Sequence, residues 1–168
     1  MSDPVVRPVG ATMPHPGVRF PPPLLFAAAF LSGWVIETRI GRLPLLGNGE
    51  TPTAVQIVAL MVALAGLGLI AWGMITFARA KTAIIPFRPA SRIVDTGPYR
   101  FTRNPMYTGF TVFYVGLAWL VNMGWPLLLL PVALLALHAL VIKREERYLL
   151  NAFGPEYESY RGRVRRWF

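Results

Sequence analysis

The sequence predicts an all-α integral membrane protein with about four transmembrane helices, and three observations support this fold class. Hydrophobic residues make up 54% of the 168 positions, and the mean hydropathy is +0.46. Charged residues make up only 15%, whereas soluble domains carry about 25%. The apolar residues also gather in four runs separated by polar segments. The second run, 53–77, has no charged residue and is long enough to cross a bilayer.

The predicted elements follow in chain order. Residues 1–23 are rich in proline and have no helical period, so we expect a flexible tail over 1–20 and no signal peptide. A single membrane domain then covers 21–168. Its predicted membrane helices are 24–40, 53–77, 106–121 and 125–142. The first has a short uncharged core, 24–36, and its full crossing of the bilayer stays open.

Helix packing is predicted at two places. Small residues in the second helix would let a neighbouring helix approach closely, and these are Ala65, Gly66, Gly68 and Gly73. Only the three residues 122–124 separate the last two helices. We therefore expect a tight antiparallel hairpin, followed by a cytoplasmic amphipathic segment, 143–168. In that segment Leu149, Phe153, Tyr157 and Tyr160 recur at helical spacing, around a turn at Gly154-Pro155.

Basic residues indicate the orientation. Lys and Arg number two in the tail, two in the first loop, six in residues 79–105, none in the hairpin loop and seven in residues 143–168. The positive-inside rule then places the two richest segments in the cytoplasm. Four spans with both termini inside satisfy this count, and we expect a bacterial cytoplasmic membrane. The net charge of +9 points to an anionic lipid surface and not to nucleic acid.

The hairpin would bring residues 99–107 close to residues 143–157. Asn104 before Pro105 is typical of a helix start, with asparagine as the N-cap. The free N–H groups of that helix start, together with the guanidinium of Arg103, suit a carboxylate ligand. In the alternative interpretation, Asn104 and Pro105 only cap the helix, and the basic and aromatic side chains anchor the chain at the membrane interface.

Glu145 and Glu146 come directly after the fourth predicted helix. Adjacent helical residues point about 100° apart, so the two carboxylates must face different surroundings. One carboxylate opposite the anion site, with Tyr99 and Tyr107 between them, suits a zwitterionic ligand that carries a flat ring. The other interpretation is a solvated helix end. No metal site is predicted, because the chain has no cysteine and only two histidines far apart in sequence.

The stretches GPYRFTRNPMYTG (97–109) and EERYLLNAFGPEYESY (145–160) resemble the isoprenylcysteine carboxyl methyltransferase and phospholipid methyltransferase families. The resemblance covers about residues 85–166. It implies a small integral membrane enzyme that transfers a methyl group from S-adenosylmethionine to a lipophilic or small acceptor. The implied cofactor contacts are Ser91, Arg92, Ile93, Val94, Tyr99, Arg103, Asn104, Pro105, Met106, Tyr107 and Glu145. We expect Arg103, Glu145 and Glu146 to be the catalytic residues.

Two positions depart from the family pattern. The family often has histidine where this chain has Asn104, which makes Asn104 a positioning group and not a base. The prenylcysteine enzymes carry an arginine where this chain has Val141, which weakens the case for a prenylcysteine carboxylate. A phospholipid amine and a small thiol are the alternative acceptors. An alternative hypothesis, of a different functional class, is a non-enzymatic four-helix membrane protein that binds anionic lipid.

Overall fold

A computed structural model describes residues 17, 18, 20–47, 49, 51–81 and 90–167, and every regular element in this part of the chain is a helix. The elements are α1 (Pro23–Arg39), α2 (Thr53–Arg79), the 3-10 turn η1 (Gly97–Arg100), α3 (Pro105–Leu120), α4 (Gly124–Leu137), the π-helical turn η2 (His138–Ile142), α5 (Lys143–Phe153) and α6 (Pro155–Arg163). The all-α prediction is confirmed. Most of the predicted tail lies outside the described residues.

Two helices in the described part of the chain are long and apolar enough to cross a membrane. One is α2, with 27 residues, and the other is the continuous 30-residue helix Gly124–Phe153, in which α4, η2 and α5 follow one another without a break. Met61 and Leu64 of α2 are more than half exposed, as lipid-facing side chains are. The chain is a membrane protein. The C-terminal segment differs from the prediction in one respect. It does not begin as a separate element at residue 143 but continues the fourth helix without a break.

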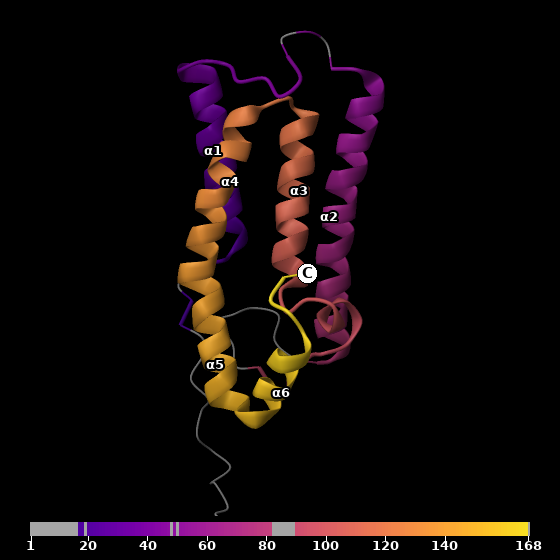
Figure 1. Cartoon of the computed structure of the whole chain (residues 1–168), viewed down its shortest axis with the longest axis vertical. Coiled ribbons are helices and arrows are strands. Elements are labelled where there is room, and N and C mark those ends of the chain that lie inside the picture. Colours follow the sequence, from indigo (N-terminus) through magenta and orange to yellow (C-terminus); the bar gives the residue numbers. More distant parts are fainter. Residues whose placement is uncertain (1–16, 19, 48, 50, 82–89, 168) are drawn as a thin grey trace, which may run out of the picture.

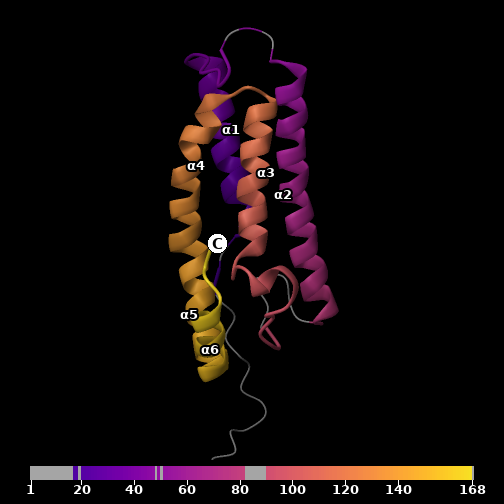
Figure 2. The same ribbon diagram turned by 45° about the vertical axis from the view of Figure 1, so that its right-hand side comes forward.

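The helices pack in two pairs, with α3 along α2 and α4 along α1 (Figures 1 and 2). The predicted tight turn between α3 and α4 is present, but each of these helices makes most of its contacts outside the hairpin. Glycines explain the α2–α3 pairing: a methyl group on Gly66 would meet the backbone of Phe113, and one on Gly116 would meet the backbone of Ala63. The predicted approach at Gly66 is thus confirmed.

Of the other three predicted contact residues of α2, one makes a close contact and two do not. Gly73 is buried against the side chain of Met106, as predicted. Gly68 has open space around it and Ala65 is exposed, so the prediction was wrong for these two. The buried positions of α2 are Ala59, Ala63, Gly66, Ile70 and Gly73, a repeat of three and four residues. Because α2 is apolar on all sides, its hydrophobic pattern does not indicate which side faces the protein, and only two of the four small residues did so.

Loops and short helices join the long helices at the two ends of the bundle (Figure 1). At the end we call the hairpin end, the segment after α1 lies against the turn between α3 and α4, and Gly124 N donates to Leu43 O at 2.6 Å. At the opposite end, the site end, residues 90–104 meet α5, α6 and the chain terminus. Val18 is also buried here, in a core cluster with Val141 and Ile142. The two segments predicted to meet therefore do lie at one end of the bundle.

Candidate functional site

The turn before α3 is held against α2. Gly97 has a φ of +58°, a conformation that glycine adopts without strain, and a methyl group there would meet the side chain of Thr76. The following turn places the Tyr99 ring against Phe77, with ring centroids 4.9 Å apart. The carbonyl of Tyr99 accepts a hydrogen bond from the Tyr160 hydroxyl at 2.8 Å. A buried tyrosine is thus fixed from both sides at the site end.

Helix α3 begins at Pro105, as predicted, but the expected capping by Asn104 is wrong. The Asn104 side chain makes no capping bond; its amide donates to the carbonyl oxygen of Arg166 at 3.2 Å. The same carbonyl accepts a bond from the Thr102 hydroxyl at 2.9 Å. The returning C-terminal residues therefore engage the side chain that would otherwise fold back onto the helix start.

The two adjacent glutamates face different partners, in agreement with their 100° offset. Glu145 Oε1 accepts a hydrogen bond from the Tyr107 hydroxyl at 2.8 Å, which joins α5 to the first turn of α3. Glu146 faces the chain terminus instead, where it meets Arg103 and Arg166. The structure thus brings Tyr107 and Glu145 together, and it brings Arg103 and Glu146 together.

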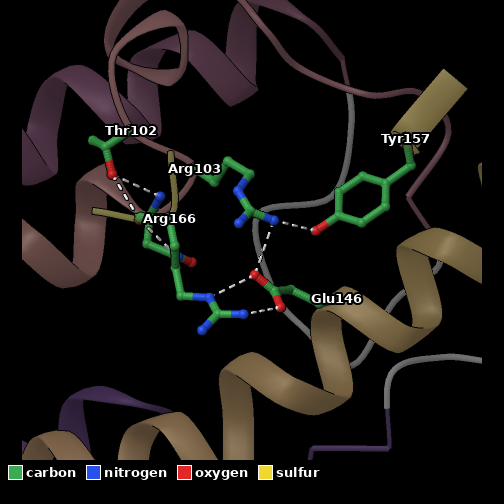
Figure 3. A network of polar contacts seen from close by, with 6 residues as sticks. Thr102, Arg103, Glu146, Tyr157 and Arg166 are labelled. Carbon is green, nitrogen blue, oxygen red and sulfur yellow. Dashed lines mark hydrogen bonds and ion pairs between the residues drawn. The ribbon is translucent and has the colours of Figure 1, made fainter. Parts of the chain in front are cut away.

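The Glu146 carboxylate lies between two guanidinium groups (Figure 3). Arg103 Nη1 is 3.0 Å from Glu146 Oε1, and it also donates to the Tyr157 hydroxyl at 3.3 Å. Arg166 donates from Nε to Oε1 at 2.9 Å and from Nη2 to Oε2 at 2.7 Å. The Arg103 and Glu146 side chains are only 11% and 17% exposed. This cluster of two cations and one anion carries a net positive charge, and its Arg103–Glu146 pair is largely shielded from water.

Two polar atoms of this end are buried without a hydrogen-bond partner among the described residues, Tyr99 Oη and Arg103 Nε. Burial raises the pKa of Tyr99 well above its ordinary value, and the nearby Tyr160 and Glu145 raise it further. The hydroxyl therefore stays protonated and can donate. Buried donors without partners are uncommon in native proteins, and a bound ligand is one way to satisfy them.

The segment 91–94 lies elsewhere at the same end. Arg92, Ile93 and Val94 line a cavity of about 510 Å³ beside the last turns of α2, whose lining also includes Trp72 and Arg79. Tyr99, Tyr107 and Glu145 do not line it. Ser91 is not part of that lining either. The residues expected to touch a cofactor are therefore split between this cavity and the Tyr107–Glu145 pair.

Residues 54–156 match the phospholipid methyltransferase family. The chain belongs to this family. The protein-S-isoprenylcysteine O-methyltransferase of Schizosaccharomyces pombe is 35% identical over 72 residues, which are 43% of this chain and 30% of that protein. The likeness thus spans less than a third of the length of that relative. No solved structure matches the chain.

The family match contains Arg103, Tyr107 and both glutamates, but it ends ten residues before Arg166. Sequence reasoning treated Arg166 only as one of several basic charges and gave no role to Thr102. One signal was available: the run Arg165-Arg166-Trp167 follows the amphipathic helices and joins two cations to a large apolar ring. Such a segment can leave the surface and pack back on the protein, as Trp167 does against the core cluster around Val141.

Proposed function

We propose that this chain is an integral membrane methyltransferase that uses S-adenosylmethionine as the methyl donor. Membership of the phospholipid methyltransferase family supports the reaction class. The observation that carries the proposal at the level of residues is the pair of buried, unpartnered donors, Tyr99 Oη and Arg103 Nε, at the end of the bundle that also holds Tyr107 and Glu145.

The residues of the site end fit such a cofactor. The positive cluster around Arg103 suits its carboxylate, and Arg103 Nε is the donor we assign to it. The Glu145 carboxylate, oriented by the Tyr107 hydroxyl, suits its amino group or a ribose hydroxyl. Tyr99 supplies a further donor. We assign Asn104, Pro105 and Met106 to the walls beside Tyr107. We assign Ser91, Arg92, Ile93 and Val94 to a separate part of the cofactor site, on the side of the cavity beside α2.

When bound, S-adenosylmethionine supplies a methyl group that is already activated by a positively charged sulfur. The chain then has to orient the two reactants and exclude water. A carboxylate or thiolate acceptor needs no proton acceptor, whereas an amine would lose its proton to Glu145. Glu146 was expected to be catalytic. We assign it instead to holding Arg103, because both of its oxygens are engaged by guanidinium groups.

We propose that the acceptor is lipophilic and reaches the site from the bilayer. A groove of about 330 Å³ between α1 and α3 is lined almost entirely by apolar side chains, from Phe110 to Leu117 on α3. It starts one helical turn beyond Tyr107, so a lipid chain in it would place its head group beside the Tyr107–Glu145 pair. We further propose that the chain crosses a bacterial cytoplasmic membrane four times, with both termini in the cytoplasm.

The class of acceptor has three candidates: a prenylcysteine carboxylate, a phospholipid amine and a small thiol. Val141, at the position where prenylcysteine enzymes carry an arginine, is fully buried in the core cluster. It contributes no charge that could hold a substrate carboxylate. This favours an acceptor other than the prenylcysteine carboxylate.

The test is methyl-label transfer from S-adenosylmethionine by membranes that contain the protein, with prenylcysteine analogues, phosphatidylethanolamine and simple thiols as acceptors. Calorimetry with S-adenosylhomocysteine measures binding directly. Glu145→Gln should abolish binding and leave helix content unchanged, whereas Glu158→Gln, an exposed position on α6, should bind as the wild type does. If the wild-type protein binds neither S-adenosylmethionine nor S-adenosylhomocysteine, the proposal is wrong and the non-enzymatic lipid-binding protein becomes the better hypothesis.

A further inference from the structure

We infer that Arg166 is a positioning residue of the proposed site: it holds Glu146 so that Arg103 keeps donors free for the ligand carboxylate. This inference rests on the proposed function and assigns a role to the chain terminus, which lies outside the family match. It starts from the course of the last residues, Val164–Trp167, which we call the C-terminal strap.

The strap is anchored along its length. After α6 ends at Arg163, Val164 is extended and buried with Tyr157 and Tyr160. Arg103 N donates to Arg165 O at 2.9 Å, so the strap runs beside the segment that leads into α3. Trp167 then packs against the core cluster. A segment held by backbone bonds and a partly buried ring presents the Arg166 side chain in a fixed direction.

The direction of the Arg166 side chain determines how Glu146 can bond to Arg103. Arg166 engages the two carboxylate oxygens with two parallel bonds, the arrangement in which guanidinium and carboxylate fit best. Arg103 therefore meets Glu146 through one nitrogen only, Nη1 to Oε1, and its Nε stays without a partner. Without Arg166, the carboxylate would be free to turn and take Arg103 in the same two-bond arrangement.

The charges lead to the same assignment. Arg103 and Glu146 alone would form a neutral pair with little attraction for a further anion. With Arg166, which is about one-third exposed, the cluster carries one excess positive charge. An anion such as the carboxylate of an amino acid group complements this excess. Arg166 thus offsets the charge of Glu146 as well as orienting its carboxylate, and both effects act through Glu146.

The experiment compares Arg166→Gln with Arg165→Gln in the full chain. The two substitutions remove the same charge from neighbouring strap residues, but the Arg165 side chain is exposed and only its carbonyl meets Arg103. We expect Arg166→Gln to weaken the Kd for S-adenosylhomocysteine by about tenfold. Arg165→Gln should leave the Kd within about twofold of wild type. Arg166→Lys should recover part of the loss, because lysine restores the charge but not the two-bond fork.

A double variant separates positioning from a direct contact. If Arg166 acts through Glu146, then Glu146→Gln with Arg166→Gln should bind no more weakly than Glu146→Gln alone. Circular dichroism checks that each variant keeps its helix content. Equal Kd values for Arg166→Gln and Arg165→Gln, or losses that add in the double variant, would overturn the inference while the proposed function stands. A wild-type chain without binding would overturn both.

Discussion

The two ends of the bundle both join chain segments that are far apart in sequence, but they use different groups. At the hairpin end the bonds come mainly from neutral side chains: Asn122 accepts from Leu46 N at 3.0 Å, and Trp125 Nε1 donates to Gly41 O at 2.8 Å. At the site end, Arg103, Glu146 and Arg166 form a charged cluster. Neutral bonds to backbone are enough to hold a loop in place.

The charged groups of the site end go beyond that need. Among the residues that the structure describes, the hairpin end has one buried carboxylate, Glu37. It anchors the loop by accepting from Leu43 N at 2.9 Å, although its second oxygen has no hydrogen-bond partner among those residues. The site end has two carboxylates on adjacent residues, each with its own partners, and two unpartnered donors beside them. The difference supports our proposal that one end mainly holds the fold and the other binds a ligand.

The largest expected effect on stability is at the packing contact between α2 and α3, the two helices that run between the ends of the bundle. Gly66→Ala would place a methyl group 2.7 Å from the carbonyl oxygen of Gly109 and against the backbone of Phe113, which forces α2 and α3 apart. We expect a loss of about 2–3 kcal/mol in the free energy of unfolding, because backbone atoms cannot move out of the way. Thermal unfolding in detergent, followed by circular dichroism, measures it.

The matched control for this substitution lies two residues away. Gly68→Ala meets nothing within 4 Å, so the variant should unfold at or above the wild-type temperature. Equal unfolding temperatures for the two variants would contradict the close packing of α2 on α3.

The next effect is at the hairpin end alone. Asn122 has a φ of +52°, and its side chain both accepts from Leu46 N and donates to Gly47 O. Asn122→Ala removes both bonds and leaves a strained backbone, so we expect a loss of about 2 kcal/mol in stability. Asn122→Gly removes the bonds without the strain and should lose less. Neither change should alter the Kd for S-adenosylhomocysteine. A weaker affinity in either variant would contradict the proposal that the hairpin end takes no part in ligand binding.

Sequence reasoning succeeded where the signal was local. Gly97 and Gly154 mark real breaks with positive φ, α3 starts at Pro105, and the helical offset of Glu145 and Glu146 predicts their separate partners. The partners of each helix were not predictable, because α2 and α4 are apolar on all sides. The C-terminal strap was missed because its backbone forms bonds with residues more than 60 positions away and Arg166 reaches back 20 positions to Glu146. The local run Arg165-Arg166-Trp167 indicates a segment that can pack on the protein, but it does not identify these partners.

The smallest effect compares one substitution at two places on α3. The Tyr114 hydroxyl donates to Pro126 O at 2.7 Å, whereas the Tyr107 hydroxyl donates to the Glu145 carboxylate. Tyr114→Phe should lower stability by about 1 kcal/mol and leave ligand binding unchanged, because it removes one neutral hydrogen bond. Tyr107→Phe should weaken the Kd for S-adenosylhomocysteine several-fold with little change in stability, because Glu145 loses the group that orients it. Unfolding temperatures and calorimetry on both variants measure the contrast, and the same response from both tyrosines would mean that the site end, like the hairpin end, only holds the fold.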